Sequence, residues 1–471
     1  MIRNRYFTFA VCLLSGSVVS VGRTALGQDW PCYGGPNHNG VISNARVTPD
    51  PESLEVLWKV PMLGKGFSGP AVVDGRVFIL DRRGTGDSGE DVLRVLDLAS
   101  GEELWTFSRP APGDTDEHTT GLPSRCGPVP VPTVTPTHVY FSGVKGMLYC
   151  LDRATQKPVW QRDLETTLNW KVHSPSPLLA DGLVIVSATF RDGGDLLKAF
   201  RAADGRPVWQ TACDYREPRG KGAGVGGVHA PPILVTIGGV RQIVATHRRA
   251  TFGIEPATGK VLWQYEGYQR GTIQAEAAVS EDGYLFLASG HDGGSAMAQV
   301  TKTDEGFSVR GIYHDDQPHQ ARACSEWRPG HWWDGHLYHV SNHFAQHGLL
   351  CMDKQGNVLW KTRYPQSRLP RFGQSCLTIV DGIGLAMDRG HLHLVDLNPE
   401  KYTPLGSIEV FTADEIDPGP QPEGLNDRKW AGYKQALYGN TWAKHAYANG
   451  LFLTRNHQFL ACVQVGHRAE D

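Results

Sequence analysis

The side chains that could do chemistry in this sequence recur at one place, directly before short apolar runs that lead into a turn. An apolar run followed by an Asp-Gly or Asn-Gly turn is typical of a strand in a small antiparallel sheet. If these strands surround one channel, the residues before them form a ring at its mouth. The predicted ligand-binding members of this ring are Arg125, His173, His229, Glu276, Trp327, Arg328, Gln374, Trp442 and Lys444. Such a mixture suits an anionic or carbohydrate-like ligand, and the alternative is a solvated channel rim.

Two kinds of catalytic chemistry are alternatives at this mouth, acid–base catalysis and metal binding. His173 or His229 could act as a base and Tyr433 as an acid, as a polysaccharide lyase or hydrolase requires. A metal ion would need two or three neutral imidazoles that converge on one point, which spacing along strands does not establish. The histidines that cluster in one segment are His331, His336, His339, His343 and His347. No Ser-His-Asp pattern and no paired carboxylates stand out in the sequence.

The elements that must position these residues form an internal repeat. A turn with the sequence Glu255-Pro256-Ala257-Thr258-Gly259 leads into a strand that carries Trp263. The same pattern recurs, with Trp at positions 58, 105, 160, 209, 263 and 360, so that the steps are 47, 55, 49, 54 and 97 residues. Because 97 is about two of the other steps, one repeat has lost its Trp. A period of this size, built from short strands, is typical of a β-propeller.

The six repeat tryptophans, Trp58, Trp105, Trp160, Trp209, Trp263 and Trp360, are predicted to be structural. A large ring at the same place in every blade fits a girdle packed between neighbouring sheets. Eight segments have the pattern of an inner strand, but the sequence ends after Val465, before an eighth outer strand. We expect residues 54–60, with Trp58, to supply that strand and close the ring. The prediction is an all-β, eight-bladed propeller of four-stranded antiparallel blades.

The first 27 residues have the pattern of a secretory signal peptide. Arg3 and Arg5 precede an apolar run from Phe7 to Val21, and Ala25-Leu26-Gly27 offers small residues for cleavage before Gln28. Cys12 lies within the apolar run, so a lipid anchor is not indicated. We expect a signal peptide at 1–27, a lead-in at 28–53 and a single propeller domain at 54–471. The exported chain is predicted to be periplasmic or secreted, without a transmembrane segment.

The composition argues against nucleic acid as a partner. The formal net charge is -3 and 20% of the residues are charged, with no basic patch among aromatic residues, so nucleic acid is not an expected partner. Eight of the nine cysteines follow the signal peptide. Cys150, Cys351 and Cys462 lie in similar strand contexts and are predicted to be buried, unpaired thiols. A monomer is expected.

The repeat resembles a known family. Turns of the form Asp-x-x-Thr-Gly-x-x-x-Trp resemble PQQ-like β-propeller repeats, which occur in quinoprotein alcohol dehydrogenases and in the BamB proteins of outer-membrane assembly. The lead-in from Trp30 to Gly40 is similar to the opening of secreted bacterial members. The resemblance implies the propeller fold over nearly the whole exported chain. It also implies an envelope protein, a peptide or a glycan as the partner.

The dehydrogenase members imply PQQ with calcium as a cofactor. In those members a Trp floor and an adjacent disulfide-bonded Cys pair enclose the quinone, and a carboxylate and an amide hold the calcium ion. None of the eight cysteines after residue 27 is adjacent to another, and no CxxCH haem motif is present, so the required residues are not identifiable. We therefore favour a non-catalytic binding or scaffold protein in the cell envelope. A PQQ-dependent alcohol dehydrogenase is the alternative, and a His/Tyr polysaccharide lyase or hydrolase is a further one.

Overall fold

The computed structural model describes most of the chain after residue 27. The described residues are 28–64, 66–84, 86–112, 129–144, 146–164, 176–187, 195–212, 230–247, 250–266, 275–290, 294–315, 321–325, 329–341, 348–362, 376–417, several within 418–442, and 443–467. Among them, no helix is both long and apolar enough to cross a bilayer. Short 3-10 turns lie at η1 (Gly35–Asn37), η2 (Pro51–Ser53), η3 (Gly86–Ser88) and η6 (Ala413–Glu415).

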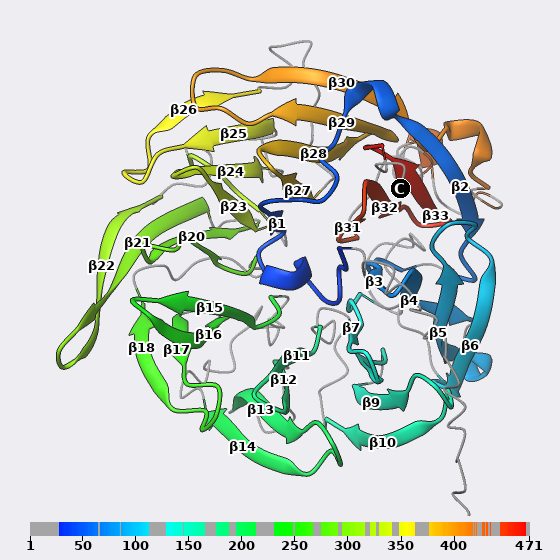
Figure 1. Cartoon of the computed structure of the whole chain (residues 1–471), viewed down its shortest axis with the longest axis horizontal. Coiled ribbons are helices and arrows are strands. Elements are labelled where there is room, and N and C mark those ends of the chain that lie inside the picture. The colour runs from blue at the N-terminus through cyan, green and yellow to red at the C-terminus, as the bar shows by residue number, and fades with distance from the viewer. Residues whose placement is uncertain are drawn as a thin grey trace, which may run out of the picture.

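The strands form eight sheets arranged as blades around a central channel (Figure 1). We number the blades one to eight by the order of their inner strands. Blade one consists of β3 (Ala71–Val73), β4 (Arg76–Arg83), β5 (Glu90–Asp97) and β6 (Glu103–Pro110), and blade two of β7 (Thr133–Val134), β8 (His138–Ser142), β9 (Met147–Asp152) and β10 (Pro158–Asp163). Blade three consists of β11 (Leu178–Ala180), β12 (Leu183–Ser187), β13 (Asp195–Arg201) and β14 (Pro207–Ala212), and blade four of β15 (Ile233–Ile237), β16 (Val240–Thr246), β17 (Thr251–Ile254) and β18 (Val261–Tyr265).

The remaining blades follow the same plan, with one strand added to blade seven. Blade five consists of β19 (Ala278–Val279), β20 (Tyr284–Ser289), β21 (Gly294–Thr303) and β22 (Gly306–His314). Blade six consists of β23 (Gly330–Trp333), β24 (His336–Ser341), β25 (Gly348–Met352) and β26 (Val358–Lys361), and blade seven of β27 (Leu377–Val380), β28 (Ile383–Asp388), β29 (His391–Asp396) and β30 (Thr403–Glu409). The added strand β1 (Val41–Ile42) lies parallel to β27 on its channel side.

Blade eight joins the two ends of the described chain. Its strands β31 (Ala446–Ala448), β32 (Leu451–Arg455) and β33 (Phe459–Gln464) are completed by β2 (Glu55–Pro61). β2 pairs antiparallel with β33, and Trp58 lies opposite Cys462. The predicted eight-bladed fold and its closure by the strand around Trp58 are therefore confirmed. Closure leaves no unpaired gap in the ring of blades, which removes an exposed edge.

Burial follows from the stacking of neighbouring blades. The second and third strands of a blade are covered on both faces, and so β12, β25 and β32 are buried at every position. In the outer strand β14, the covered residues Trp209 and Thr211 alternate with exposed ones. Turns with positive φ, such as Asp74-Gly75 and Asp381-Gly382, join the first two strands of a blade, because such turns match the twist of paired strands.

Several of the repeat tryptophans connect their blade to the next. The Trp209 ring lies on Gly259 of the following blade, and its indole N–H donates to the Pro256 carbonyl at 3.1 Å. Trp58 lies in the same way on Gly101, and Trp160 lies on Gly205. Blade five, which has lost its Trp, uses Tyr313 against Gly356 instead. In each of these four turns the glycine, which has no Cβ, leaves the space that the aromatic ring of the previous blade occupies.

Gly259→Ala should destabilise the ring more than the same change at Gly239. Gly259 has a φ of +74°, and a Cβ there would come within 2.5 Å of the Trp209 ring, whereas Gly239 has a φ of +76° and open space around it. Chemical denaturation should show a loss of about 2–4 kcal/mol for Gly259→Ala, since backbone strain and overpacking add, and about 1–2 kcal/mol for Gly239→Ala. Equal losses would contradict the packing role of the turn.

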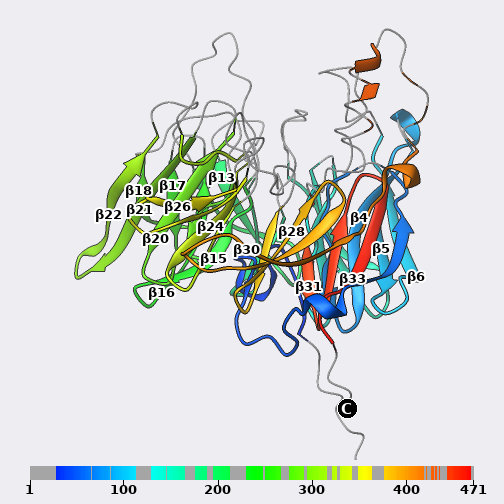
Figure 2. The same ribbon diagram turned by 90° about the horizontal axis from the view of Figure 1, so that it is seen from above.

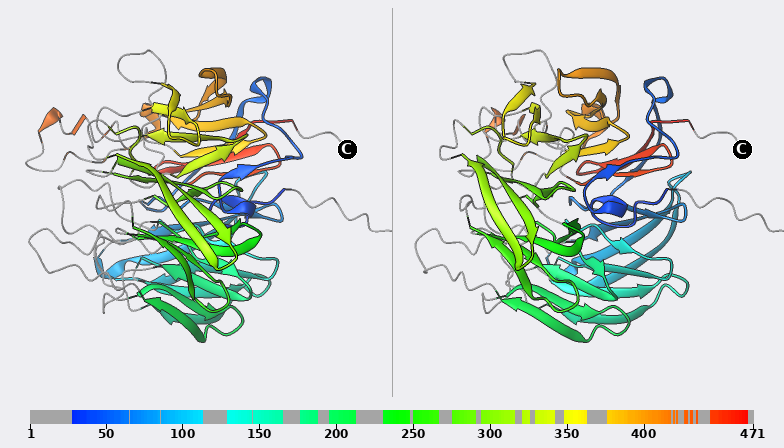
Figure 3. Two further views of the ribbon diagram at one scale, coloured as in Figure 1. Left: turned by 90° about the vertical axis from the view of Figure 1, so that its left-hand side faces the viewer. Right: turned by 60° about the vertical axis from the view of Figure 1, so that its left-hand side comes forward.

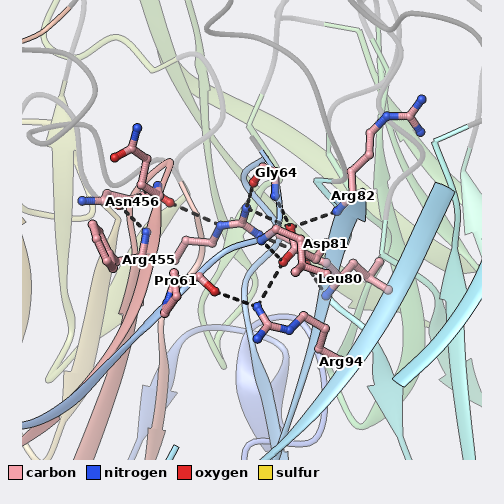
Figure 4. A network of polar contacts seen from close by, with 12 residues as sticks. Pro61, Gly64, Leu80, Asp81, Arg82, Arg94, Arg455 and Asn456 are labelled. Atoms are coloured by element: carbon pink, nitrogen blue, oxygen red, sulfur yellow. Dashed lines mark hydrogen bonds and ion pairs between the residues drawn. The ribbon is translucent and has the colours of Figure 1, made fainter. Parts of the chain in front are cut away.

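A buried charge network lies where the ring closes (Figure 4). Arg455 of β32 is fully buried and donates to the Leu80 carbonyl at 3.0 Å and to the Gly64 carbonyl at 3.3 Å. Asp81 of β4, also fully buried, accepts from the Leu63 amide at 2.7 Å and from Arg94 at 3.2 Å. Burial lowers the pKa of Arg455 to about 10, so it stays charged at neutral pH. The network ties blade eight to blade one and to the segment that follows β2.

Asp81→Ala should weaken closure strongly, because it leaves buried guanidinium groups without their carboxylate. Removal of one partner from a buried ion pair typically costs about 3–5 kcal/mol. Glu90→Ala is the control, since the Arg83–Glu90 pair is exposed, with 51% and 33% side-chain exposure, and should cost no more than about 1 kcal/mol. Thermal unfolding of both variants checks the difference. Similar melting temperatures for the two would show that closure does not depend on Asp81.

The three cysteines singled out from the sequence, Cys150, Cys351 and Cys462, are buried thiols. None of them forms a disulfide with another described cysteine. Burial raises the pKa of both Cys150 and Cys351 to about 12, which keeps these thiols protonated. They behave as small apolar side chains in the blade cores.

Candidate functional site

The lead-in, residues 28–53, enters the central channel. Figure 1 shows its first part, with β1, inside the ring of blades, and the turned views of Figures 2 and 3 place this part toward one face of the disc. Trp30 exchanges two backbone hydrogen bonds with Val72 of blade one, at 2.9 and 2.8 Å. The Pro31 carbonyl accepts from Val134 of blade two at 2.8 Å. The channel is therefore lined on the inside by the chain's own N-terminal segment.

The local sequence of the lead-in explains its tight path. Gly34 and Gly35 have φ values of +69° and +73°, which favour glycine. A Cβ on Gly35 would come within 2.8 Å of the Trp30 ring, so the aromatic side chain packs directly on the turn. Trp30 itself is only 2% exposed. The sequence analysis did not predict this packed turn, in which Gly34 caps η1 and Gly35 begins it.

The far end of the lead-in is fixed on blades seven and eight. The Asp381 carboxylate, in the turn after β27, accepts from the Asn44 amide at 2.6 Å and the Ala45 amide at 2.9 Å. The Tyr447 hydroxyl of blade eight donates to the Val47 carbonyl. Because the Asp381 turn joins the first two strands of its blade, the lead-in enters from the face that carries these turns. The predicted mouth residues precede the inner strands, at the opposite ends of those strands.

A polar cluster lies where the lead-in meets the inner ends of blades five and eight. The Tyr33 hydroxyl donates to the Glu276 carboxylate, and Lys444 lies 3.1 Å from the same carboxylate. The Lys444 ammonium also lies 5.0 Å from the centre of the Tyr33 ring, a cation–π distance. Burial, followed by the nearby negative charge of Glu276, raises the pKa of Tyr33 well above its ordinary range. Tyr33 therefore remains a neutral donor, and the cluster carries a balanced pair of charges.

A small cavity of about 50 Å³ adjoins this cluster. Apolar side chains such as Ile233 and Val235 form much of its wall, together with Trp332. His331 also lines it and is 4% exposed. The Nδ1 of His331 lies 2.6 Å from the Asn39 carbonyl, so this nitrogen carries the proton and donates it. Nε2 is then an acceptor, and it makes no hydrogen bond to any described atom.

The structure brings together two members of the predicted mouth ring, Glu276 and Lys444. Glu276 is 5% exposed and is already bonded to Tyr33 and Lys444, so its carboxylate is part of an internal contact. The ligand-binding role of both residues remains a prediction. The other predicted members fall outside the described residues, namely Arg125, His173, His229, Trp327, Arg328, Gln374 and Trp442, as does Tyr433.

The histidine cluster is dispersed in the part of blade six that the structure covers. His331 and His339 are buried, and their Nδ1 atoms bond to separate backbone carbonyls, those of Asn39 and Pro329. His336 bonds to the Asp334 carbonyl at 2.8 Å, and His343 and His347 are outside the described residues. Among the side chains placed by the structure, no group of three or more His, Cys, Asp or Glu could hold a metal ion.

PQQ and calcium do not fit the described part of the channel. Calcium requires several oxygen ligands, and the Glu276 carboxylate that faces the channel already accepts from Tyr33 and pairs with Lys444. Trp30, the buried indole of the lead-in, packs on Gly35 and pairs with Val72 through its backbone. The channel interior described here is therefore a packed polar cluster and not a preformed quinone site.

Acidification should destabilise the channel through His331. Burial lowers the pKa of His331 to about 4, below the ordinary value of about 6.5, so the folded state binds fewer protons between these pH values. Stability is then complete above about pH 6.5 and falls as the pH drops toward 4, by up to about 1.4 kcal/mol per unit. Urea unfolding should show a smaller loss between pH 7 and pH 4.5 in His331→Gln than in the wild type. Parallel curves over that range would contradict this assignment.

Comparison with known proteins agrees with this architecture. A family model described as outer membrane protein assembly factor BamB matches residues 43–125 and 89–362. The structure of BamB from Moraxella catarrhalis has a TM-score of 0.54 at 12% identity, covering 89% of this chain and 99% of that one. Quinohemoprotein alcohol dehydrogenase from Comamonas testosteroni has a TM-score of 0.58 at 13% identity, covering 94% and 81%. At these identities the structural likeness shows the fold alone.

A more similar sequence covers only part of each chain. Tetrathionate hydrolase from Acidithiobacillus ferrooxidans is 25% identical over 248 residues, which are 50% of this chain and 44% of that protein. The chain thus spans less than half the length of that relative. The family model, in contrast, matches well over half of this chain and coincides with the Trp repeat. The chain belongs to the PQQ-like β-propeller family that includes the assembly factor BamB.

Proposed function

We propose that this chain is an exported binding or scaffold protein of the cell envelope. It takes its ligand or partner at the mouth face, formed by the residues that precede the inner strands. The partner is an envelope protein, a peptide or a glycan. Residues 1–27 act as the signal peptide, and the exported protein, a lead-in followed by one propeller domain, is periplasmic or secreted.

The observation that carries this proposal is the position of the lead-in inside the channel. The lead-in enters the channel from the face that carries the turns between the first two strands of the blades. Inside the channel, its Tyr33 contacts Glu276 and Lys444. Because the charges of Glu276 and Lys444 offset each other, the cluster forms a nearly neutral floor. A rigid ring with such a floor can present the loops of one face to a partner, which favours binding over catalysis in the channel.

The residues that precede the inner strands in the sequence indicate the chemistry of the partner. Arg125 and Arg328 precede inner strands and would offer guanidinium groups, which bind carboxylate or phosphate in a bidentate way. Trp327 and Trp442 would offer flat apolar faces, as sugar rings require. The family match to an outer-membrane assembly factor supports a protein partner in the envelope.

Site-specific photocrosslinking in the envelope tests the proposal. A photoreactive residue at Arg125 or Arg328 should give discrete crosslinked products, whereas one at Ala154 or Ala257 should not, because these two exposed alanines lie in turns on the opposite face. Digestion of the products by protease or by glycosidase then separates a protein partner from a glycan. Equal crosslinking from both faces, or none from the mouth, would refute a mouth-face binding site.

Thermal melts with PQQ and calcium test the enzyme alternative in the same preparation. A binding protein should show an unchanged melting temperature, because the described channel does not provide a quinone site. A ligand that binds the folded state at 100 times its Kd stabilises it by about 2.7 kcal/mol, which such melts resolve. A clear rise with PQQ plus calcium would favour the dehydrogenase alternative over the scaffold.

A further inference from the structure

We propose that Gln28, as the first residue of the exported chain, is converted to a cyclic pyroglutamyl end. This inference rests on the proposed export, with cleavage between Gly27 and Gln28. In the reaction the α-amino nitrogen attacks the side-chain carboxamide carbon of the same residue. A new C–N bond closes a five-membered lactam, the bond to the amide nitrogen Nε2 breaks, and ammonia leaves. The step is neither an oxidation nor a reduction and needs no second substrate.

The structure places Gln28 in a defined seat. Its backbone nitrogen lies 2.5 Å from Oδ1 of Asn449, in the turn between β31 and β32 of blade eight. Asn449 has a φ of +52°, so its backbone is fixed by the tight turn that carries it. The two residues next in line, Asp29 and Trp30, bond to Asp74 and Val72 of blade one. Gln28 is thus the outer end of a segment that is held continuously against two blades.

The surroundings of the nitrogen favour the reactive form of the amine. Only an unprotonated α-amino group is a nucleophile, and its ordinary pKa is about 7.7–8.0. Gln28 is half-buried, and burial disfavours the charged ammonium. The nearest carboxylate along the chain, Asp29, accepts from the Asp74 amide at 3.2 Å, and burial raises its pKa. The neutral oxygen of Asn449 can accept one hydrogen from the nitrogen without a charge on either partner.

The lactam form of Gln28 fits the site beside Asn449 better than the form with a free α-ammonium group does. An α-ammonium carries three hydrogens, and Asn449 Oδ1 supplies one acceptor for them. The lactam keeps one N–H, which can still donate to Asn449, and it carries no charge. Oε1 of Gln28 is buried and makes no hydrogen bond to any described atom. Cyclisation removes the polar amide nitrogen beside this buried oxygen, so the lead-in ends in a compact, neutral ring.

Intact mass and N-terminal sequencing of the exported protein test the inference. The full-length precursor is expressed with its own residues 1–27, and the mature protein is collected from the envelope. We expect a mass that equals a chain beginning at Gln28 minus one ammonia. Stepwise N-terminal degradation should fail until pyroglutamyl aminopeptidase has treated the denatured protein. Gln28→Ala should begin at the same position, show no ammonia loss and be open to degradation.

The outcomes separate the inference from the export on which it rests. A chain that begins at Gln28 with its full mass would overturn the inference and leave the export intact. A chain that begins elsewhere, or that retains residues 1–27, would overturn both the cleavage position and the inference. A chain that begins at Gln28 and lacks one ammonia supports both.

The role of the seat is tested by two variants of Asn449. Asn449→Asp places a carboxylate beside the nitrogen, which stabilises the ammonium and should slow the loss of ammonia several-fold in freshly exported protein. Asn449→Ser, which keeps a neutral acceptor, is the matched control and should convert at nearly the wild-type rate. Identical rates in all three proteins would show that the seat does not govern the reaction.

Discussion

Closure of the ring is the constraint on which the rest of this structure depends. β2 must reach β33 across almost the whole length of the chain, and the pairing of Trp58 with Cys462 fixes the register. The buried Arg455 and Asp81 then join the last blade to the first. A desolvated pair of this kind is costly unless its hydrogen bonds are satisfied, and here backbone carbonyls and amides complete both groups. Closure is therefore specific as well as stabilising.

Between these ends, the same contact recurs at several blade boundaries. An aromatic ring of one blade lies on the turn glycine of the next, as Trp209 does on Gly259. The contact requires a positive φ at the glycine and the absence of a Cβ, which explains why the turn and the Trp recur together. Tyr313 at Gly356 shows that the geometry is kept even where the Trp is lost.

The lead-in lies in the central channel. Its backbone pairs with inner strands of blades one and seven, and its Tyr33 completes the cluster of Glu276 and Lys444. Two of the charged residues that the sequence predicts at a ligand mouth, Glu276 and Lys444, are paired with each other in this internal contact. The binding role that we propose therefore rests on the other residues that precede the inner strands.

The sequence alone determined the fold, because the Trp step, the Asp-Gly turns and the missing last strand are local patterns with a fixed period. It also identified Glu276 and Lys444 as neighbours of one channel, since both precede an inner strand. It did not place the lead-in, because a segment without periodic alternation carries no signal for its partner. Contacts such as Tyr33 with Glu276 and Gln28 with Asn449 join residues that are 243 and 421 positions apart. Only the closed ring brings such residues together, and so the tertiary structure decided where the lead-in lies in the channel.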